Sequence, residues 1–109
     1  MRLKVVSGQV LGQQFSLRSG ATTLGGKGAD IDLADPTLES QHARLEIKDP
    51  FVRFSNLANN HESYVNGIKV QSCWVDAGDI LQLGTTRLQL ESESDEESTA
   101  AVLDRLTTK

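Results

Sequence analysis

Residues 77–90 read AGDILQLGTTRLQL and carry the clearest strand pattern of the chain. Apolar and polar residues alternate within residues 80–83, and the alternation resumes over residues 87–90 after a turn at Gly84. A period of two is typical of half-buried antiparallel strands, because successive side chains point to opposite faces of the sheet. The stretch therefore predicts two neighbouring strands joined by a short turn.

The same kind of pattern extends outward over the first 90 residues. Segment 43–48 alternates in the same way, and turn signals leave only segments of about four to seven residues, too short for ordinary helices. Asn66-Gly67 predicts a two-residue type I′ hairpin between strands at 63–65 and 68–71, because both turn positions need positive φ. The inner faces of two packed sheets are predicted to be formed by Leu3, Val5, Phe15, Leu17, Leu24, Ile31, Leu33, Leu45, Ile47, Val52, Phe54, Val65, Ile80, Leu83, Leu88 and Leu90.

Length, charge and cysteine content narrow the class of protein. A chain of 109 residues fits one domain, and it has no apolar run of transmembrane length and no signal peptide at its start. Residues 1–90 hold nine basic and nine acidic side chains with no basic stripe, which argues against nucleic-acid binding. Cys73 is the only cysteine, so no internal disulfide is possible, and we expect it to be a small buried or half-buried apolar residue. These features predict a soluble cytoplasmic domain that makes no direct membrane contact.

The last part of the chain differs in composition from the rest. Residues 91–109 hold two basic and six acidic side chains, and residues 91–99 contain only acids and small polar residues. Such a segment cannot bury enough apolar surface to order itself. We therefore expect one folded domain over residues 1–90 and a flexible acidic tail or linker over residues 91–109. A short helix could begin within residues 100–106.

Six short motifs follow one another in a fixed order at compatible spacing. The sequence from about Arg2 to Leu90 thereby resembles the forkhead-associated (FHA) domain, on the motifs Leu24-Gly25, Asp30-Ile31-Asp32-Leu33-Ala34-Asp35, His42-Ala43-Arg44-Leu45, Asn56-Leu57, Tyr64-Val65-Asn66-Gly67 and Ala77-Gly78-Asp79-Ile80-Leu81-Gln82-Leu83-Gly84. The resemblance implies an all-β sandwich of two antiparallel sheets with about eleven strands. It also implies that loops at one end form a recognition surface, which in the family usually binds phosphothreonine peptides.

Three positions depart from the phosphate-binding members of the family. Gly26 stands where they have an Arg, and Glu39 stands where they have a Ser that donates to the phosphate. His61 replaces the Asn that holds the backbone of the ligand, and Glu62 follows it where Gly is usual. Gly25 and His42 remain, and the resemblance gives both a structural role in shaping the loops, as it does for the hairpin residues Asn66 and Gly67.

These departures predict weak phosphate binding. Losing a charge-assisted bond from Arg costs about 1.5 to 3 kcal/mol. A carboxylate about 5 Å from a phosphate repels it by roughly 1 to 2 kcal/mol even in water. Together they correspond to a loss of about a hundredfold to several thousandfold. Lys27 and Ser40, each one residue beyond a missing ligand, could replace them if the loops are shifted.

Other chemistry has no support in the sequence. His42 and His61 are nineteen residues apart without a third His or a thiolate pair, so no metal site is predicted. The Gly-rich segment 25–28 has Lys27 but neither the spacing nor the following Ser or Thr of a phosphate-binding loop. No catalytic set is singled out by a motif. We therefore predict no enzyme activity and no cofactor.

Three functions remain open. The first is a protein-interaction adaptor that binds a protein partner, or a second copy of itself, independently of phosphothreonine. The second is a phosphothreonine reader that uses Lys27, Ser40 and Ser63, and the third is a structural module of a larger, secretion-type assembly. Exposed Trp74 or Phe51 are possible anchors on other faces. The predicted partner-binding loop residues are Gly26, Lys27, Glu39, Ser40, Gln41, His61 and Ser63.

Overall fold

The computed structural model describes residues 1–48, 51–59 and 61–92. They form eleven strands, which confirms the all-β prediction: β1 (Arg2–Ser7), β2 (Gln14–Ser16), β3 (Gly20–Gly25), β4 (Ile31–Asp32), β5 (Ala43–Lys48), β6 (Phe51–Asn56), β7 (Ser63–Val65), β8 (Ile68–Val70), β9 (Ser72–Val75), β10 (Ile80–Leu83) and β11 (Thr86–Glu91). The predicted acidic tail and short helix fall mostly on residues 93–109, outside the described residues.

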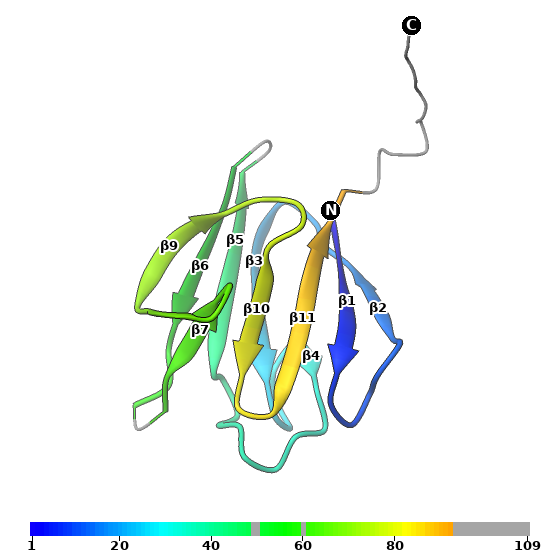
Figure 1. Cartoon of the computed structure of the whole chain (residues 1–109), viewed down its shortest axis with the longest axis vertical. Helices are drawn as coiled ribbons and strands as arrows, with labels where there is room; N and C mark the ends of the chain where they lie inside the picture. Colours follow the sequence, from blue (N-terminus) through cyan, green and yellow to red (C-terminus); the bar gives the residue numbers. More distant parts are fainter. Residues whose placement is uncertain (49–50, 60, 93–109) are drawn as a thin grey trace, which may run out of the picture.

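The strands form two sheets that pack into a sandwich (Figure 1). One sheet has the strand order β2-β1-β11-β10-β7-β8, and the other has the order β4-β3-β5-β6-β9. The first and last strands of the described chain pair directly, with Arg2 opposite Glu91 and an ion pair of 2.9 Å between their side chains. The fold is thus closed by contacts between residues far apart in the sequence.

The core between the sheets contains most of the predicted apolar residues, with one clear error. Leu81 is fully buried and lies opposite Leu88, whereas Ile80, which was predicted to face the core, is only half-buried. Residues 81 and 83 share a face of β10 because side chains alternate, so Ile80 must point the other way. Phe15 is half-buried and packs against the edge of the core rather than inside it. The buried core also includes Ala43 and Val75.

The predicted hairpin between β7 and β8 is confirmed. Val65 pairs with Ile68, and the two turn residues have φ of 52° at Asn66 and 82° at Gly67. The Asn66 side chain also reaches the neighbouring strand, because its Oδ1 accepts a hydrogen bond from the Ile80 amide at 2.9 Å. This contact fixes the hairpin against β10.

One strand pair departs from the antiparallel prediction. β4 runs parallel to the end of β3, with Leu24 opposite Ile31. Two reciprocal hydrogen bonds turn the chain back: the Thr23 amide donates to the Asp30 carboxylate at 3.0 Å, and the Asp30 amide donates to the Thr23 hydroxyl at 2.9 Å. The short loop thereby returns to the level of Leu24, so that a two-residue strand can lie beside β3.

The loops that follow β3, β4, β6 and β10 gather at one end of the sandwich, at the bottom of Figure 1. The beginning of β6 and the connection from β9 to β10 lie at the opposite end. In the part of the chain that the structure describes, no helix has the length and apolar character needed to span a bilayer. We call the first group the loop end.

Candidate functional site

The end of β3 packs tightly against the loop that precedes β5. Gly26 donates its amide to the backbone oxygen of Glu39 at 2.9 Å. A Cβ atom placed on Gly25 would lie 2.6 Å from the backbone oxygens of both Glu39 and Ser40. Position 25 therefore requires glycine because there is no room for a side chain. Gly26 itself is buried, so it contributes only its backbone to the site.

His42 lies at the centre of the loop end and is fully buried. Its Nδ1 accepts a hydrogen bond from the Glu39 amide at 3.2 Å, and its own amide donates to the Leu24 carbonyl at 2.9 Å. Its carbonyl accepts bonds from the amides of Leu57 and Ala58 at 2.8 and 3.1 Å. The residue thus holds β3, the loop before β5 and the loop after β6 together.

The environment of His42 favours its neutral form. Burial lowers the pKa of its imidazole below the ordinary 6.5, and the nearby His61 ring lowers the pKa further. Because Nδ1 accepts a bond from the Glu39 amide, the proton of the neutral ring is on Nε2. His42 therefore acts as a fixed acceptor that shapes the loop.

Glu39 bridges two loops where phosphate-binding relatives have a donor. Its Oε2 lies 3.1 Å from the Nδ1 of His61 and accepts a hydrogen bond from the Asn59 amide at 3.2 Å. The Glu39 side chain is 29% exposed and that of His61 is 47% exposed, so the pair lies at the surface. The structure therefore joins two of the three departures noted in the sequence in a single contact.

Asn56, the last residue of β6, holds the loop after β6 in place through its side chain. Its Oδ1 accepts hydrogen bonds from the Ser63 hydroxyl at 3.0 Å and the Ala58 amide at 3.3 Å, and its Nδ2 donates to the His61 carbonyl at 3.1 Å. Ser63, which was predicted to face the ligand, is fully buried. Its hydroxyl is already engaged with Asn56, so it supports the loop and does not face the surface.

The exposed part of the loop end is polar. Lys27, Ser40 and Gln41, three of the predicted partner-binding residues, are all exposed. Beside them, between the loop after β6 and strand β8, lies a pocket of about 260 Å³. Its lining is formed by Asn56, Ala58, Asn59, His61, Glu62, Lys69, Val70 and Gln71.

Sequence analysis missed the residue that anchors the loop before β5. Asp35 is 2% exposed, and its carboxylate accepts five hydrogen bonds. Two of these bonds come from the amide and hydroxyl of Thr37. The other three come from Thr85, in the turn before β11, and from Thr86, the first residue of β11. Asp35 appeared in the sequence only as the last residue of the motif Asp30–Asp35, because its partners Thr85 and Thr86 are about fifty positions away.

The acidic side chains at the loop end make contacts within the domain. No group of three His, Cys, Asp or Glu side chains suited to a metal ion occurs among residues 1–48, 51–59 and 61–92. The Asp35 carboxylate accepts a hydrogen bond from the Thr85 amide, and the Glu39 carboxylate accepts one from the Asn59 amide.

Comparisons with known proteins agree with this architecture. The family model for the inner membrane component of T3SS, cytoplasmic domain, matches residues 4–94. T3SS is the type III secretion system, and members of this family are structural and binding domains on the cytoplasmic side rather than enzymes, in agreement with the sequence analysis. A search of curated protein sequences gives no match.

Several solved structures share the fold. The FHA domain of the CT664 protein from Chlamydia trachomatis is 31% identical, with a TM-score of 0.77 over 84% of this chain and 95% of that chain. The cytoplasmic domain of the T3SS sorting platform protein PscD from P. aeruginosa is 23% identical, with a TM-score of 0.72 over 97% of this chain and 98% of that chain. The FhaA FHA domain, solved in complex with the intracellular domain of Rv3910, is 22% identical, with a TM-score of 0.73 over 81% of this chain and 96% of that chain.

The predicted FHA resemblance is confirmed by these matches, and the family model adds the biological setting that the motifs did not specify. The chain belongs to the family of cytoplasmic domains of the inner membrane component of the type III secretion system, and it has the FHA fold.

Proposed function

We propose that this domain is a structural docking module of a T3SS inner membrane component, and that its loop end binds another protein of the secretion system without phosphothreonine. The family match supports the third function considered from the sequence, a module of a secretion-type assembly, over a free-standing signalling adaptor. Independence from phosphothreonine and the use of the loop end are our inference from the geometry.

The contact of Glu39 with Asn59 and His61 carries the proposal. A phosphate at this position would meet a carboxylate that is already bonded to the Asn59 amide at 3.2 Å. Repulsion at about 5 Å costs roughly 1 to 2 kcal/mol, and displacing the carboxylate would break its bonds to the neighbouring loop. No guanidinium compensates, because position 26 is a buried glycine. The same contact makes the loops rigid, which favours binding of a protein surface by lowering the entropy lost on association.

The proposal is tested by reversing charge on the exposed loop residues of the full-length protein. The double variant K27E/Q41E changes two exposed positions at the loop end, and the control R18E/Q14E makes the same change in charge at two exposed positions, one in the connection from β2 to β3 and one on β2. We expect K27E/Q41E to lose co-purification of other secretion-system proteins and to lower secretion, while R18E/Q14E retains both. Thermal melts by circular dichroism verify that both variants fold.

Two results would contradict the proposal. If K27E/Q41E retains the secretion-system partners as well as wild type does, the loop end is not the docking surface. If treating the partners with a phosphatase removes their binding to wild type, then binding depends on phosphate and the role assigned to Glu39 is wrong.

One observation keeps phosphothreonine reading as a second candidate. Lys27 and Ser40 are both exposed, and a Cβ atom added to the intervening Gly28 would lie 4.0 Å from the Cβ of Ser40. The two side chains therefore belong to adjoining loops. A one-residue slip of β5 that brought them inward would turn His42 and Leu45 out of the core, but both residues are fully buried. Loss of phosphopeptide binding in a K27A variant would support this candidate.

A further inference from the structure

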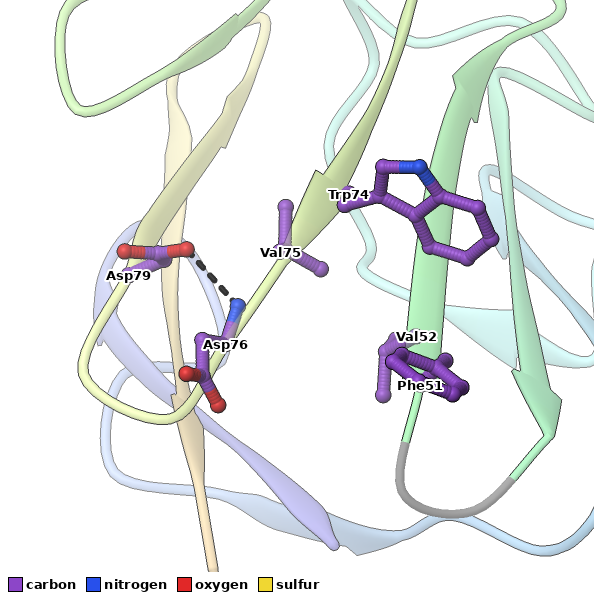
Figure 2. Close-up of a pocket in the computed structure, with 6 residues that line it drawn as sticks. All are labelled: Phe51, Val52, Trp74, Val75, Asp76 and Asp79. Carbon is purple, nitrogen blue, oxygen red and sulfur yellow. Dashed lines mark hydrogen bonds between the residues drawn. The ribbon is translucent and has the colours of Figure 1, made fainter.

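A second surface lies at the end of the sandwich opposite the loop end. Phe51 at the start of β6 and Trp74 on β9 are 63% and 64% exposed. Their rings meet edge to face with centroids 5.9 Å apart, and the Arg53 guanidinium lies 5.1 Å from the centre of the Trp74 ring. Figure 2 shows the two rings on neighbouring strands. Exposed aromatic side chains held in a fixed geometry are typical anchors of protein interfaces.

β9 is also an open sheet edge. It is the outer strand of its sheet among the described residues, and at four residues it is the longest of the four edge strands. Its residues, Ser72 to Val75, include neither proline nor a charged side chain, the two features that commonly protect an edge from pairing. The strand can therefore accept a further strand.

The hydrogen-bonding pattern between β9 and β6 leaves the amide and carbonyl of Trp74 pointing to the open edge. Asn56 donates its amide to the Gln71 carbonyl at 2.8 Å, which makes these two opposite residues a hydrogen-bonded pair. Such pairs alternate along antiparallel strands, so Cys73 and Val75 also bond to β6, and the amide and carbonyl of Trp74 point to the open edge. The Asp76 amide also points away from β6, and it donates a hydrogen bond to the Asp79 carboxylate at 2.8 Å.

The end of this edge is acidic. A pocket of about 410 Å³ is lined by Phe51, Val52, Trp74, Val75, Asp76 and Asp79, a set with two carboxylates and no basic side chain (Figure 2). Asp79 uses both oxygens internally, bonding to the Asp76 amide and to the Asn66 side chain. One oxygen of the Asp76 carboxylate accepts a hydrogen bond from the Ala77 amide at 2.8 Å. A lysine or arginine would complement this end of the pocket, whereas a phosphate would be repelled.

From these observations we propose that the edge of β9 docks an extended segment of a partner protein in which an apolar residue and a Lys or Arg stand two positions apart. Side chains on one face of a strand recur every second residue, as Trp74 and Asp76 do. A paired segment would place its apolar residue against the rings of Phe51 and Trp74 and its basic residue against Asp76. The backbone groups of Trp74 supply the pairing. This surface is separate from the loop end and does not depend on the function proposed for it.

A second copy of this chain fits the edge less well. In antiparallel pairing centred on Trp74, Ser72 of one copy would lie opposite Asp76 of the other. No basic residue would then meet Asp76. Two short strands would also bury much less than the roughly 1,000 Å² expected of a specific interface. The chemistry therefore favours a different chain.

The test uses three synthetic peptides of about eight residues, the length of a long strand. The first has Lys and Val two positions apart in a threonine background, the second has Glu in place of Lys, and the third is the first peptide with N-methyl groups on Val and on the residue between Val and Lys. Each is titrated into the ¹⁵N-labelled domain. We expect the Lys peptide to shift the amide resonances of Ser72, Trp74 and Asp76 and to bind about tenfold more tightly than the Glu peptide. The N-methylated peptide keeps both side chains but lacks the amide donors needed to pair with β9 in either strand direction, so it should cause no shifts.

Two variants separate the contributions. W74T keeps a strand-forming residue at an exposed position and should weaken binding of the Lys peptide about tenfold or more. D76N keeps the oxygen that binds the Ala77 amide and should remove most of the preference for Lys over Glu. The loop variant K27E/Q41E should bind the Lys peptide as wild type does.

Four results would overturn the proposal. They are equal binding of the Lys and Glu peptides, shifts confined to other strands, no binding of the Lys peptide up to about 1 mM, and a concentration-dependent dimer of the domain that W74T abolishes. The last result would assign the edge to a second copy of the chain.

Discussion

Replacing Asp35 by Asn is expected to lower the free energy of unfolding by about 3 kcal/mol. The wild-type carboxylate accepts bonds from the amide and hydroxyl of Thr37 at 2.9 and 2.6 Å on one oxygen. Its other oxygen accepts bonds from the amide and hydroxyl of Thr85 at 3.0 and 2.7 Å and from the Thr86 hydroxyl at 2.9 Å. These bonds hold the loop before β5 to the turn before β11.

The magnitude follows from what an amide can and cannot accept. The best orientation of Asn keeps its oxygen toward Thr85 and Thr86 and turns its NH₂ group toward Thr37. The Thr37 amide then faces a donor and is left unsatisfied, at a cost of about 1 to 3 kcal/mol. The remaining bonds lose their charge assistance, at roughly half a kcal/mol each. A total near 3 kcal/mol corresponds to a fall in Tm of about 12 to 24 °C for a domain of this size.

The assay is urea denaturation at about pH 7, followed by far-ultraviolet circular dichroism. Asp32→Asn is the matched control, because Asp32 is exposed and accepts one bond, from the Ala34 amide at 2.8 Å. D32N should cost less than about 1 kcal/mol. If D35N costs no more than D32N, the reasoning is refuted.

Acid provides a second measurement on the same variant. Burial raises the pKa of Asp35, but the hydrogen bonds from Thr37, Thr85 and Thr86 lower it more, so the pKa lies well below its ordinary 3.8. As the pH falls below 3.8, the unfolded chain takes up the proton first, and the stability that Asp35 contributes above that pH is lost. D35N should therefore lose less stability than wild type below pH 3.8. An unchanged acid dependence would contradict this account.

Three further changes test other parts of the structure. Gly25→Ala should cost about 2 kcal/mol or more by urea denaturation, because its Cβ would lie 2.6 Å from two backbone oxygens, whereas Gly26→Ala, with its nearest contact at 3.3 Å, should cost less. Burial lowers the pKa of His42 below 6.5, so the free energy of unfolding of wild type should fall as the pH drops below 6.5. Urea denaturation at a series of pH values should show a much smaller fall in His42→Asn. Leu81→Ala should cost about 2 to 5 kcal/mol and Ile80→Ala about 1 kcal/mol, and equal costs would contradict the assigned faces of β10.

The parts of the fold that could be predicted are those encoded by near neighbours. The turn at Asn66-Gly67 has the two positive φ values that its residue types favour, so its hairpin could be read locally. The alternation of β5 likewise predicted its bounds, Ala43–Lys48. Ile80 was misassigned because it stands beside another apolar residue, and only the odd-numbered one shares a face with Leu83.

The parts that could not be predicted depend on distant partners. Glu39 and His61 were each recognised as departures from phosphate-binding relatives, but their contact across 22 positions could not be read from the sequence. The role of Asp35 depends on threonines about fifty positions away. Ser63 was named as a possible ligand contact, whereas packing buries it beneath the loop.

The central claim is that the loop end does not read phosphothreonine, and a peptide titration tests it most directly. The wild-type domain and the double variant G26R/E39S are titrated with a degenerate phosphothreonine peptide library and its unphosphorylated twin, and amide shifts are recorded by NMR. The account predicts no phosphate-dependent binding by wild type. It predicts a gain of about a hundredfold or more in the variant, because G26R/E39S adds a guanidinium and removes the carboxylate. Phosphate-dependent binding by wild type, with shifts at Lys27 and Ser40, would contradict the account.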